Sequence, residues 1–178
     1  MKVKFLFAAI CALPLLAGAG VRVDLNGLQD GIKLRKTAGD FQLQKGHWLK
    51  GDQQDCYLYL TAKPAQEWTA EEFTFVPEKS GTVTIAFTGS WAEKPEDMAY
   101  FLIDDVTVNG EALPNGGFEE VADGKPAGWM PAKSPVVVDD AHSGSKAVKI
   151  NHVNRVSQKI AVEAGKPYTV KFFAKDMK

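Results

Sequence analysis

Residues 100–120 read YFLIDDVTVNGEALPNGGFEE, and this stretch decides how the rest of the chain is interpreted. YFLIDDVTV (100–108) has the pattern of a strand with one buried face. GEALPNG (110–116) supplies the glycine, proline and asparagine residues that favour a tight connection between strands. NGGFEE (115–120) then looks like the opening of a further strand. The stretch therefore predicts a short loop between two strands in the middle of the chain.

The same strand pattern recurs along the chain. Runs of alternating apolar and polar residues are interrupted by Gly, Asn or Pro, and no helix-length 3.6-residue period follows residue 20. The predicted strands cover residues 21–27, 31–37, 40–46, 56–63, 68–76, 81–89, 100–108, 135–139, 146–152, 155–162 and 168–175. We expect an all-β fold, an antiparallel β-sandwich.

The first 19 residues predict a secretory signal peptide. Two lysines precede an apolar run over residues 5–16, and Ala-Gly-Ala at 17–19 suits cleavage. The run is shorter than the roughly 20 apolar residues of a membrane span. We therefore expect a secreted protein, extracellular or periplasmic, with no membrane span and a mature part at 20–178.

Composition and motifs exclude several functions. A net charge of −1 gives no electrostatic reason to expect nucleic-acid binding. Cys56 would be the single cysteine after cleavage, which excludes an internal disulfide and a cysteine metal cluster. Neighbouring acids on a strand point to opposite faces, so no adjacent acid pair alone supplies the facing carboxylates of a glycoside hydrolase. Without an HExxH motif or a phosphate loop either, we expect no enzyme.

Several segments together resemble carbohydrate-binding modules, the galactose-binding-domain-like jelly rolls grouped as families four, nine and twenty-two. Residues 115–175 resemble the opening half of such a module through NGGFEE, GKPAGW, HSGSKAVKI and RVSQKIAVEAGKPYTVKFFAK. Residues 68–108 resemble its closing half, from WTAEEFTFV to YFLIDDVTV, and VRVDLNG (21–27) resembles a middle strand. The resemblance covers most of the predicted mature chain and implies a jelly roll.

The order of these segments departs from the family, because the closing half comes first. One interpretation is a single, circularly permuted jelly roll over 20–178, in which GEALPNG joins the family's first and last strands. The other is a tandem, with a first module at 20–112 and a truncated second module at 115–178. The permuted fold is favoured because a half-module would leave open sheet edges, and both interpretations stay open.

The resemblance also implies a structural calcium ion where the first strand of the family meets the last. The matching ligands are the carboxylate of Glu119, the backbone carbonyl of Gly117, and Asp104 or Asp105. Calcium takes six to eight oxygen ligands, and carboxylates beside glycine turns suit it. The alternative is that these acids hydrogen-bond the backbone of nearby turns.

The candidate sugar-binding residues are aromatic. Tyr57 and Tyr59 share one face of a predicted strand, opposite Cys56 and its neighbouring leucines, and Gln54 is close in sequence. Trp48 and Trp91 are predicted in loops, where exposed aromatic rings often mark binding. The alternative, favoured for Trp91, is that each ring caps an end of the core.

Trp68 and Trp129 match structural positions of the family, and Tyr168 and Phe172 are expected to pack inside. The leading prediction is a secreted, non-catalytic module that binds a neutral polysaccharide or oligosaccharide by aromatic stacking. Two alternatives are a structural or adhesive cell-surface β-sandwich that binds protein partners, and an accessory subunit of a glycoside hydrolase system. Fold analogy alone cannot separate these three functions.

Overall fold

The computed structural model describes much of the chain after the predicted signal peptide, which itself lies outside the described residues. It describes residues 21–24, 33–35, 41–49, 53–60, 66–89, 91–131, 133 and 136–177. The first four of these ranges, and residue 136, are described by their backbone.

The described residues are mainly in β-strands. The strands are β1 (Val21–Asp24), β2 (Lys33–Arg35), β3 (Phe41–Leu49), β4 (Gln53–Leu60), β5 (Thr69–Val76), β6 (Gly81–Gly89), β7 (Phe101–Val108), β8 (Glu111–Ala112), β9 (Val121–Ala122), β10 (Lys125–Pro126), β11 (Met130–Pro131), β12 (Val136–Val138), β13 (Ala147–Ile150), β14 (Val156–Val162) and β15 (Tyr168–Asp176). A 3₁₀ turn, η1 (Pro95–Asp97), lies between β6 and β7.

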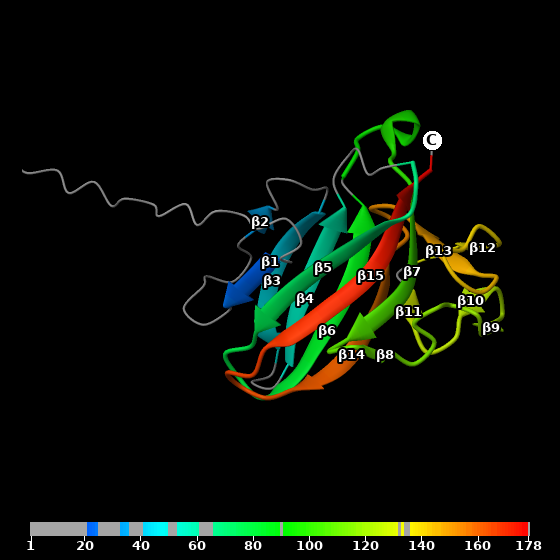
Figure 1. Cartoon of the computed structure of the whole chain (residues 1–178). Helices are drawn as coiled ribbons and strands as arrows, with labels where there is room; N and C mark the ends of the chain where they lie inside the picture. The colour runs from blue at the N-terminus through cyan, green and yellow to red at the C-terminus, as the bar shows by residue number, and fades with distance from the viewer. Residues whose placement is uncertain are drawn as a thin grey trace, which may run out of the picture.

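Two large sheets pack face to face (Figure 1). The first sheet has the order β1-β5-β15-β7-β13-β12, with β8 added to β7, and the second has the order β11-β14-β6-β4-β3-β2. Strands β9 and β10 form a small separate hairpin. The predicted all-β sandwich is therefore confirmed, whereas the jelly-roll order of its strands stays a prediction.

Two pairings differ from the predicted antiparallel arrangement. Strand β1 runs parallel to β5, and β4 runs parallel to β6 over its whole length. The second case follows from the path of the chain, because β5 lies between β4 and β6 in sequence but belongs to the opposite sheet. Each crossing between the sheets reverses the chain, so β6 returns in the direction of β4.

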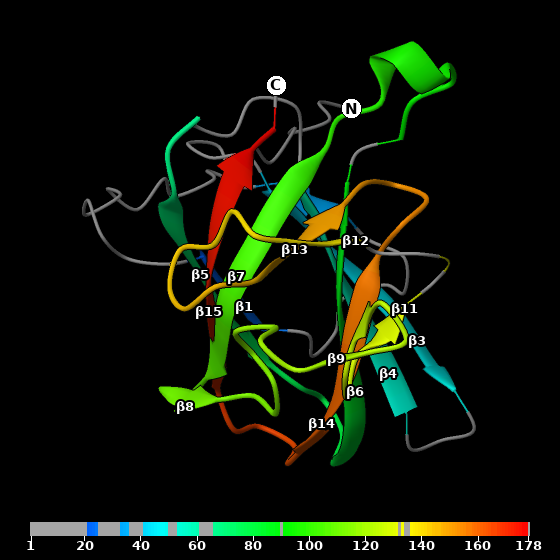
Figure 2. The ribbon, with the colours of Figure 1, turned by 90° about the vertical axis from the view of Figure 1, so that its right-hand side faces the viewer.

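Strands from the two halves of the sequence alternate within the same sheets. Strand β15 inserts between β5 and β7, while β14 pairs with β6 and β13 pairs with β7. Residues 136–176 thus complete the sheets that residues 69–108 begin (Figure 2). A separate second module would instead pair these strands with one another. The domain boundaries and the permuted order themselves stay predictions.

The core lies between the two sheets and is rich in aromatic rings. Phe172 of β15 packs edge-on against Phe87 of β6, with ring centroids 5.0 Å apart. Trp129, only 5% exposed, contacts Phe118 at 4.9 Å and Phe87 at 6.1 Å. Burying a large apolar side chain contributes about 1.5–3 kcal/mol. The predicted internal positions of Trp129 and Phe172 are confirmed, and Tyr168 packs against the core while half-buried.

The loop after β7 is fastened to that strand by its backbone. The N–H of Val106 donates to the carbonyl of Gly116 at 2.9 Å, and the N–H of Leu113 donates to the carbonyl of Val106 at 3.1 Å. A side chain on Gly116 would collide with the Val106 carbonyl, so glycine is required there. The indole N–H of Trp129 donates to the carbonyl of Asn115 at 2.9 Å. The NGG segment is thereby held against both β7 and the core.

Candidate functional site

A loop over residues 142–146, HSGSK, lies against β7 and is held there by carboxylates. Asp104 of β7 has no exposed surface, and its Oδ2 accepts the N–H groups of His142 at 2.8 Å and Ser143 at 3.2 Å. Burial raises the pKa of the Asp104 carboxyl above its ordinary value of 3.8. The N–H donors oppose that rise, and the charge of Asp105 adds to it.

Asp105 contacts the same loop, although neighbours on a regular strand point to opposite faces. Its Oδ2 lies 2.6 Å from Nδ1 of His142, and its Oδ1 accepts the hydroxyl of Ser143 at 2.7 Å. The backbone explains this, because Asp105 has φ of +50° where the pairing of β7 with β15 shifts register. Such a β-bulge re-aims a side chain. Both aspartates therefore bind the same loop.

Glu119 holds the other end of the loop. Its Oε1 accepts the N–H groups of Ser145 at 2.8 Å and Lys146 at 2.9 Å, and its Oε2 accepts the Ser145 hydroxyl at 2.7 Å. These hydrogen bonds lower the pKa of Glu119 below its ordinary value of 4.5. Gly144 has φ of +64°, and a side chain there would run into the Glu119 carboxylate. Glycine is thus required for two independent reasons.

The predicted calcium ligands are only partly brought together. A side chain on Gly117 would stand 3.5 Å from Oδ1 of Asp105 and 3.9 Å from Oδ1 of Asp104, so this glycine adjoins both aspartates. Glu119 instead binds residues 145 and 146. Within the described ranges, no group of three or more His, Cys, Asp and Glu side chains has the arrangement of a metal site. The oxygens of the aspartate pair are nevertheless of the kind that calcium takes.

Trp91 is the predicted sugar-binding residue whose side chain is described, and it is 74% exposed. It lies in the segment that connects β6 to β7. This segment and the C-terminal end of β15 lie at the same end of the sandwich (Figures 1 and 2). The prediction that Trp91 lies in a loop is therefore confirmed.

The other predicted binding residues lie on β3 and β4, and their side chains lie outside the described residues. Trp48 falls within β3 and not in the predicted loop, because a register shift between residues 45 and 48 lets the strand continue past Gly46. Its paired residue on β4 is Gln54. In the parallel register of β4 with β6, Tyr57 pairs with Ala86 and Tyr59 pairs with Thr88.

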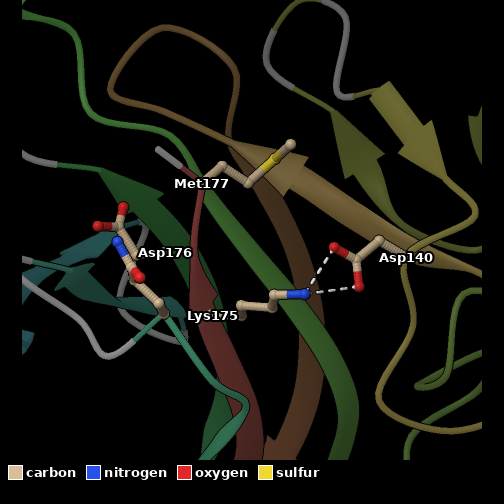
Figure 3. A pocket seen from close by; sticks show the side chains of 5 residues that line it. Asp140, Lys175, Asp176 and Met177 are labelled. Carbon is tan, nitrogen blue, oxygen red and sulfur yellow. Dashed lines mark hydrogen bonds and ion pairs between the residues drawn. The ribbon is translucent and has the colours of Figure 1, made fainter.

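A polar pocket that the sequence did not predict opens where β15 ends (Figure 3). Its volume is about 300 Å³, and its lining residues are Gln66, Asp140, Lys175, Asp176 and Met177. One feature of the sequence, the alternation of residues on β15, indicates side chains on this surface. On β15, Lys171, Phe173 and Lys175 alternate with the core residues of the strand and therefore belong to its outer face.

Comparison of the chain with protein-family models, with curated proteins and with solved structures gives no match. The resemblance to carbohydrate-binding modules therefore rests on the sequence segments quoted above. In the described part of the chain, no helix has the length and apolar character needed to cross a bilayer.

Proposed function

We propose that this protein is a secreted, non-catalytic module that binds a neutral polysaccharide or oligosaccharide by aromatic stacking. The exposure of Trp91 carries this proposal. Tryptophan side chains are strongly buried on average, yet the Trp91 indole is more exposed than any other large apolar side chain in the described residues. An indole left in water offers a flat apolar face to a ligand.

The surroundings of Trp91 favour a neutral ligand. The segment after it contains three acidic residues, Glu93, Glu96 and Asp97, against one cation, Lys94. An anionic polymer would meet this acidic excess, whereas the C–H face of a neutral sugar ring can lie on the indole without a charge penalty. Binding that depends on stacking should also withstand salt, because salt screens charges and not apolar contacts.

The register of the second sheet supports a longer aromatic surface. Tyr57, Tyr59 and Trp91 follow one another toward one end of this sheet, since Tyr59 pairs with Thr88 and Trp91 comes three residues after Thr88. Residues two apart on a strand are spaced by roughly 6.6–7 Å, a scale similar to that of neighbouring sugar rings. Gln54, which pairs with Trp48 of β3, aligns with the core residue Val83 of β6, so the proposed surface rests on Tyr57, Tyr59 and Trp91.

Affinity electrophoresis of the mature protein tests this function, on gels that contain a neutral xylan, β-glucan or mannan. We expect at least one polymer to slow migration at both low and high salt. Trp91→Ala should abolish the retardation, whereas Lys94→Ala, in the same exposed segment, should keep it. Unchanged retardation of the Trp91→Ala protein, or no retardation by any polymer, would contradict the proposal. The latter outcome would favour the structural or adhesive alternative.

We further propose that Asp104, Asp105 and Gly117 hold a structural calcium ion. The observation in favour is that a bulge brings both aspartates to one side of β7, where burial raises the pKa of Asp104. A divalent cation supplies positive charge that favours the ionised form of both carboxylates. The ion would thereby strengthen the attachment of the loop at 142–146.

A further inference from the structure

The pocket at the end of β15 is built from three separate parts of the chain. Gln66 precedes β5, Asp140 follows β12, and Lys175 lies near the end of β15. In Figure 3 the ammonium group of Lys175 points toward the carboxylate of Asp140. Met177 adds an apolar thioether to the lining. The pocket therefore exists only when the strands of the first sheet are assembled.

The cation of this pocket is held in place. Nζ of Lys175 lies 2.9 Å and 2.8 Å from the two carboxylate oxygens of Asp140, and 5.8 Å from the ring centre of Trp68. The Trp68 ring meets the ring of His142 edge-on at 5.9 Å. A fixed ion pair loses little side-chain entropy when a ligand binds beside it, and such preorganisation favours binding.

The pocket also offers hydrogen-bonding groups that are not already used. Among the described residues, the Asp176 carboxylate and the Gln66 amide have no hydrogen-bond partner. A lysine ammonium has three N–H donors, and Lys175 directs two of its contacts to Asp140. Acceptors and donors therefore both line the pocket. A hydroxyl group, which both donates and accepts, satisfies such a mixture.

The charge and the volume of the pocket restrict the class of ligand further. Two carboxylates, Asp140 and Asp176, outnumber the single cation Lys175, so the lining disfavours an anion. The volume of about 300 Å³ is at the lower limit of the range of ligand pockets. A polymer in an extended conformation does not fit such a space, whereas one hydroxyl-rich ring does.

We propose that this pocket binds a single neutral sugar ring through its hydroxyl groups. Hydroxyls donate to Asp140 and Asp176 and accept from Lys175 and Gln66. This site is separate from the aromatic surface of Trp91 and the tyrosines. It goes beyond the proposed binding of polymers and does not depend on it.

Ligand-observed saturation-transfer NMR of the mature protein tests the site. The probes are neutral methyl glycosides of glucose, galactose, mannose and xylose at millimolar concentration, with methyl glucuronide as the anionic comparison. We expect transfer to at least one neutral glycoside and less to the glucuronide. Lys175→Met should lower the signal at least fivefold, because it removes the ammonium and keeps the length of the side chain. Lys171→Met, on the same face of β15 but paired with Glu72, should leave it unchanged.

Further variants allow the site to be tested even if one substitution prevents folding. If Lys175→Met does not fold, Asp140→Asn and Gln66→Ala, at exposed positions, carry the test, and each should weaken the signal. Absence of transfer to all four neutral glycosides, an equal signal in the pocket variants, or a preference for the glucuronide would overturn the proposal. Trp91→Ala should keep the glycoside signal while losing polymer retardation. Failure of this site and failure of the polymer-binding function are therefore distinguishable.

Discussion

The imidazole of His142 stacks face to face on the phenyl ring of Phe173, with centroids 3.4 Å apart and planes 12° from parallel. Asp105 lies 2.6 Å from Nδ1 of the same imidazole. The loop at 142–146 is thus attached to the outer face of the first sheet by one aromatic contact and by the carboxylates of β7. Asp140, which lines the pocket, comes two residues before this loop. Attachment of the loop therefore helps to position Asp140 in the proposed sugar site.

Glu119 should make the loop sensitive to acid. Its pKa is lowered because the loop donates hydrogen bonds to the ionised form, chiefly from the Ser145 backbone. A group whose folded pKa is lowered stabilises the fold above its unfolded pKa, and this contribution is lost as pH falls through the folded value. We expect the amide resonances of Ser145 and Lys146 to titrate together, with a midpoint below pH 4.5.

An NMR titration of the wild type and Glu119→Gln measures this effect. The variant should lack the titration, because glutamine does not ionise in this range. A wild-type midpoint above pH 4.5 would show that the loop does not favour the ionised carboxylate. Asp104, whose pKa is raised by burial, contributes to stability in the opposite sense as pH changes. The chemical shifts of the loop amides therefore report the ionisation of Glu119 more specifically than the pH dependence of global stability does.

Two glycines with similar backbone conformations allow the cost of backbone strain to be distinguished from the cost of a steric collision. Gly144 (φ +64°) and Gly124 (φ +73°) are both left-handed, but only a side chain on Gly144 would meet another atom, in Glu119. Gly124→Ala should cost about 1 kcal/mol of unfolding free energy, since the left-handed conformation disfavours a Cβ. Gly144→Ala should cost clearly more and should also shift the Ser145 amide. Equal losses in urea unfolding would argue against the Glu119 contact.

Neighbouring phenylalanines on β15 test its register. Phe172 is 1% exposed and lies in the core, whereas Phe173 is half-buried on the outer face against His142. Phe172→Ala should lower the unfolding free energy by about 3–5 kcal/mol, and Phe173→Ala should lower it less. Urea denaturation measures both. The reverse order would indicate a one-residue slip of β15, which exchanges the two faces of a strand.

Removal of calcium should lower the melting temperature if Asp104, Asp105 and Gly117 hold the ion. An ion that binds only the folded state stabilises it by about 2.7 kcal/mol at a hundredfold excess over its dissociation constant. EDTA should therefore lower the melting temperature, and added calcium should restore it. In Asp105→Asn the response to calcium should be weaker. Identical wild-type melts in EDTA and in calcium would rule the ion out.

Truncation of Tyr57 or Tyr59 should weaken polymer binding and leave the thermal melt nearly unchanged. The reason is that a ring used for stacking on a ligand contributes little to the core. Affinity electrophoresis and melting curves of Tyr57→Ala and Tyr59→Ala measure the two effects separately. A loss of about 3–5 kcal/mol of stability, typical of a buried aromatic ring, would instead place these tyrosines in the core. The binding surface would then centre on Trp91.

The sequence by itself determined that the fold is a β-sandwich. Strand alternation and turn residues are local signals, and the stretch at 100–120 predicted the strand β7 and the short loop that follows it. The prediction that NGGFEE opens a further strand was wrong, because residues 115–120 form turns and irregular chain. Phe172 could be assigned to the interior from the sequence, because its parity on the strand is a local property, whereas the assignment of Trp129 came from the resemblance to the family. Trp48 could not be placed correctly, since the bulge that extends β3 past Gly46 depends on the partner strand.

Tertiary structure alone decided which strands became neighbours and which side chains met. Parallel pairing of β4 with β6 and insertion of β15 between β5 and β7 arise from crossings between sheets, which no local period encodes. Asp104 and Asp105 face one loop because of a bulge, against the alternation expected from sequence. Lys175 and Asp140 form a pocket although 35 positions separate them, because such a contact depends on how the sheets and loops pack.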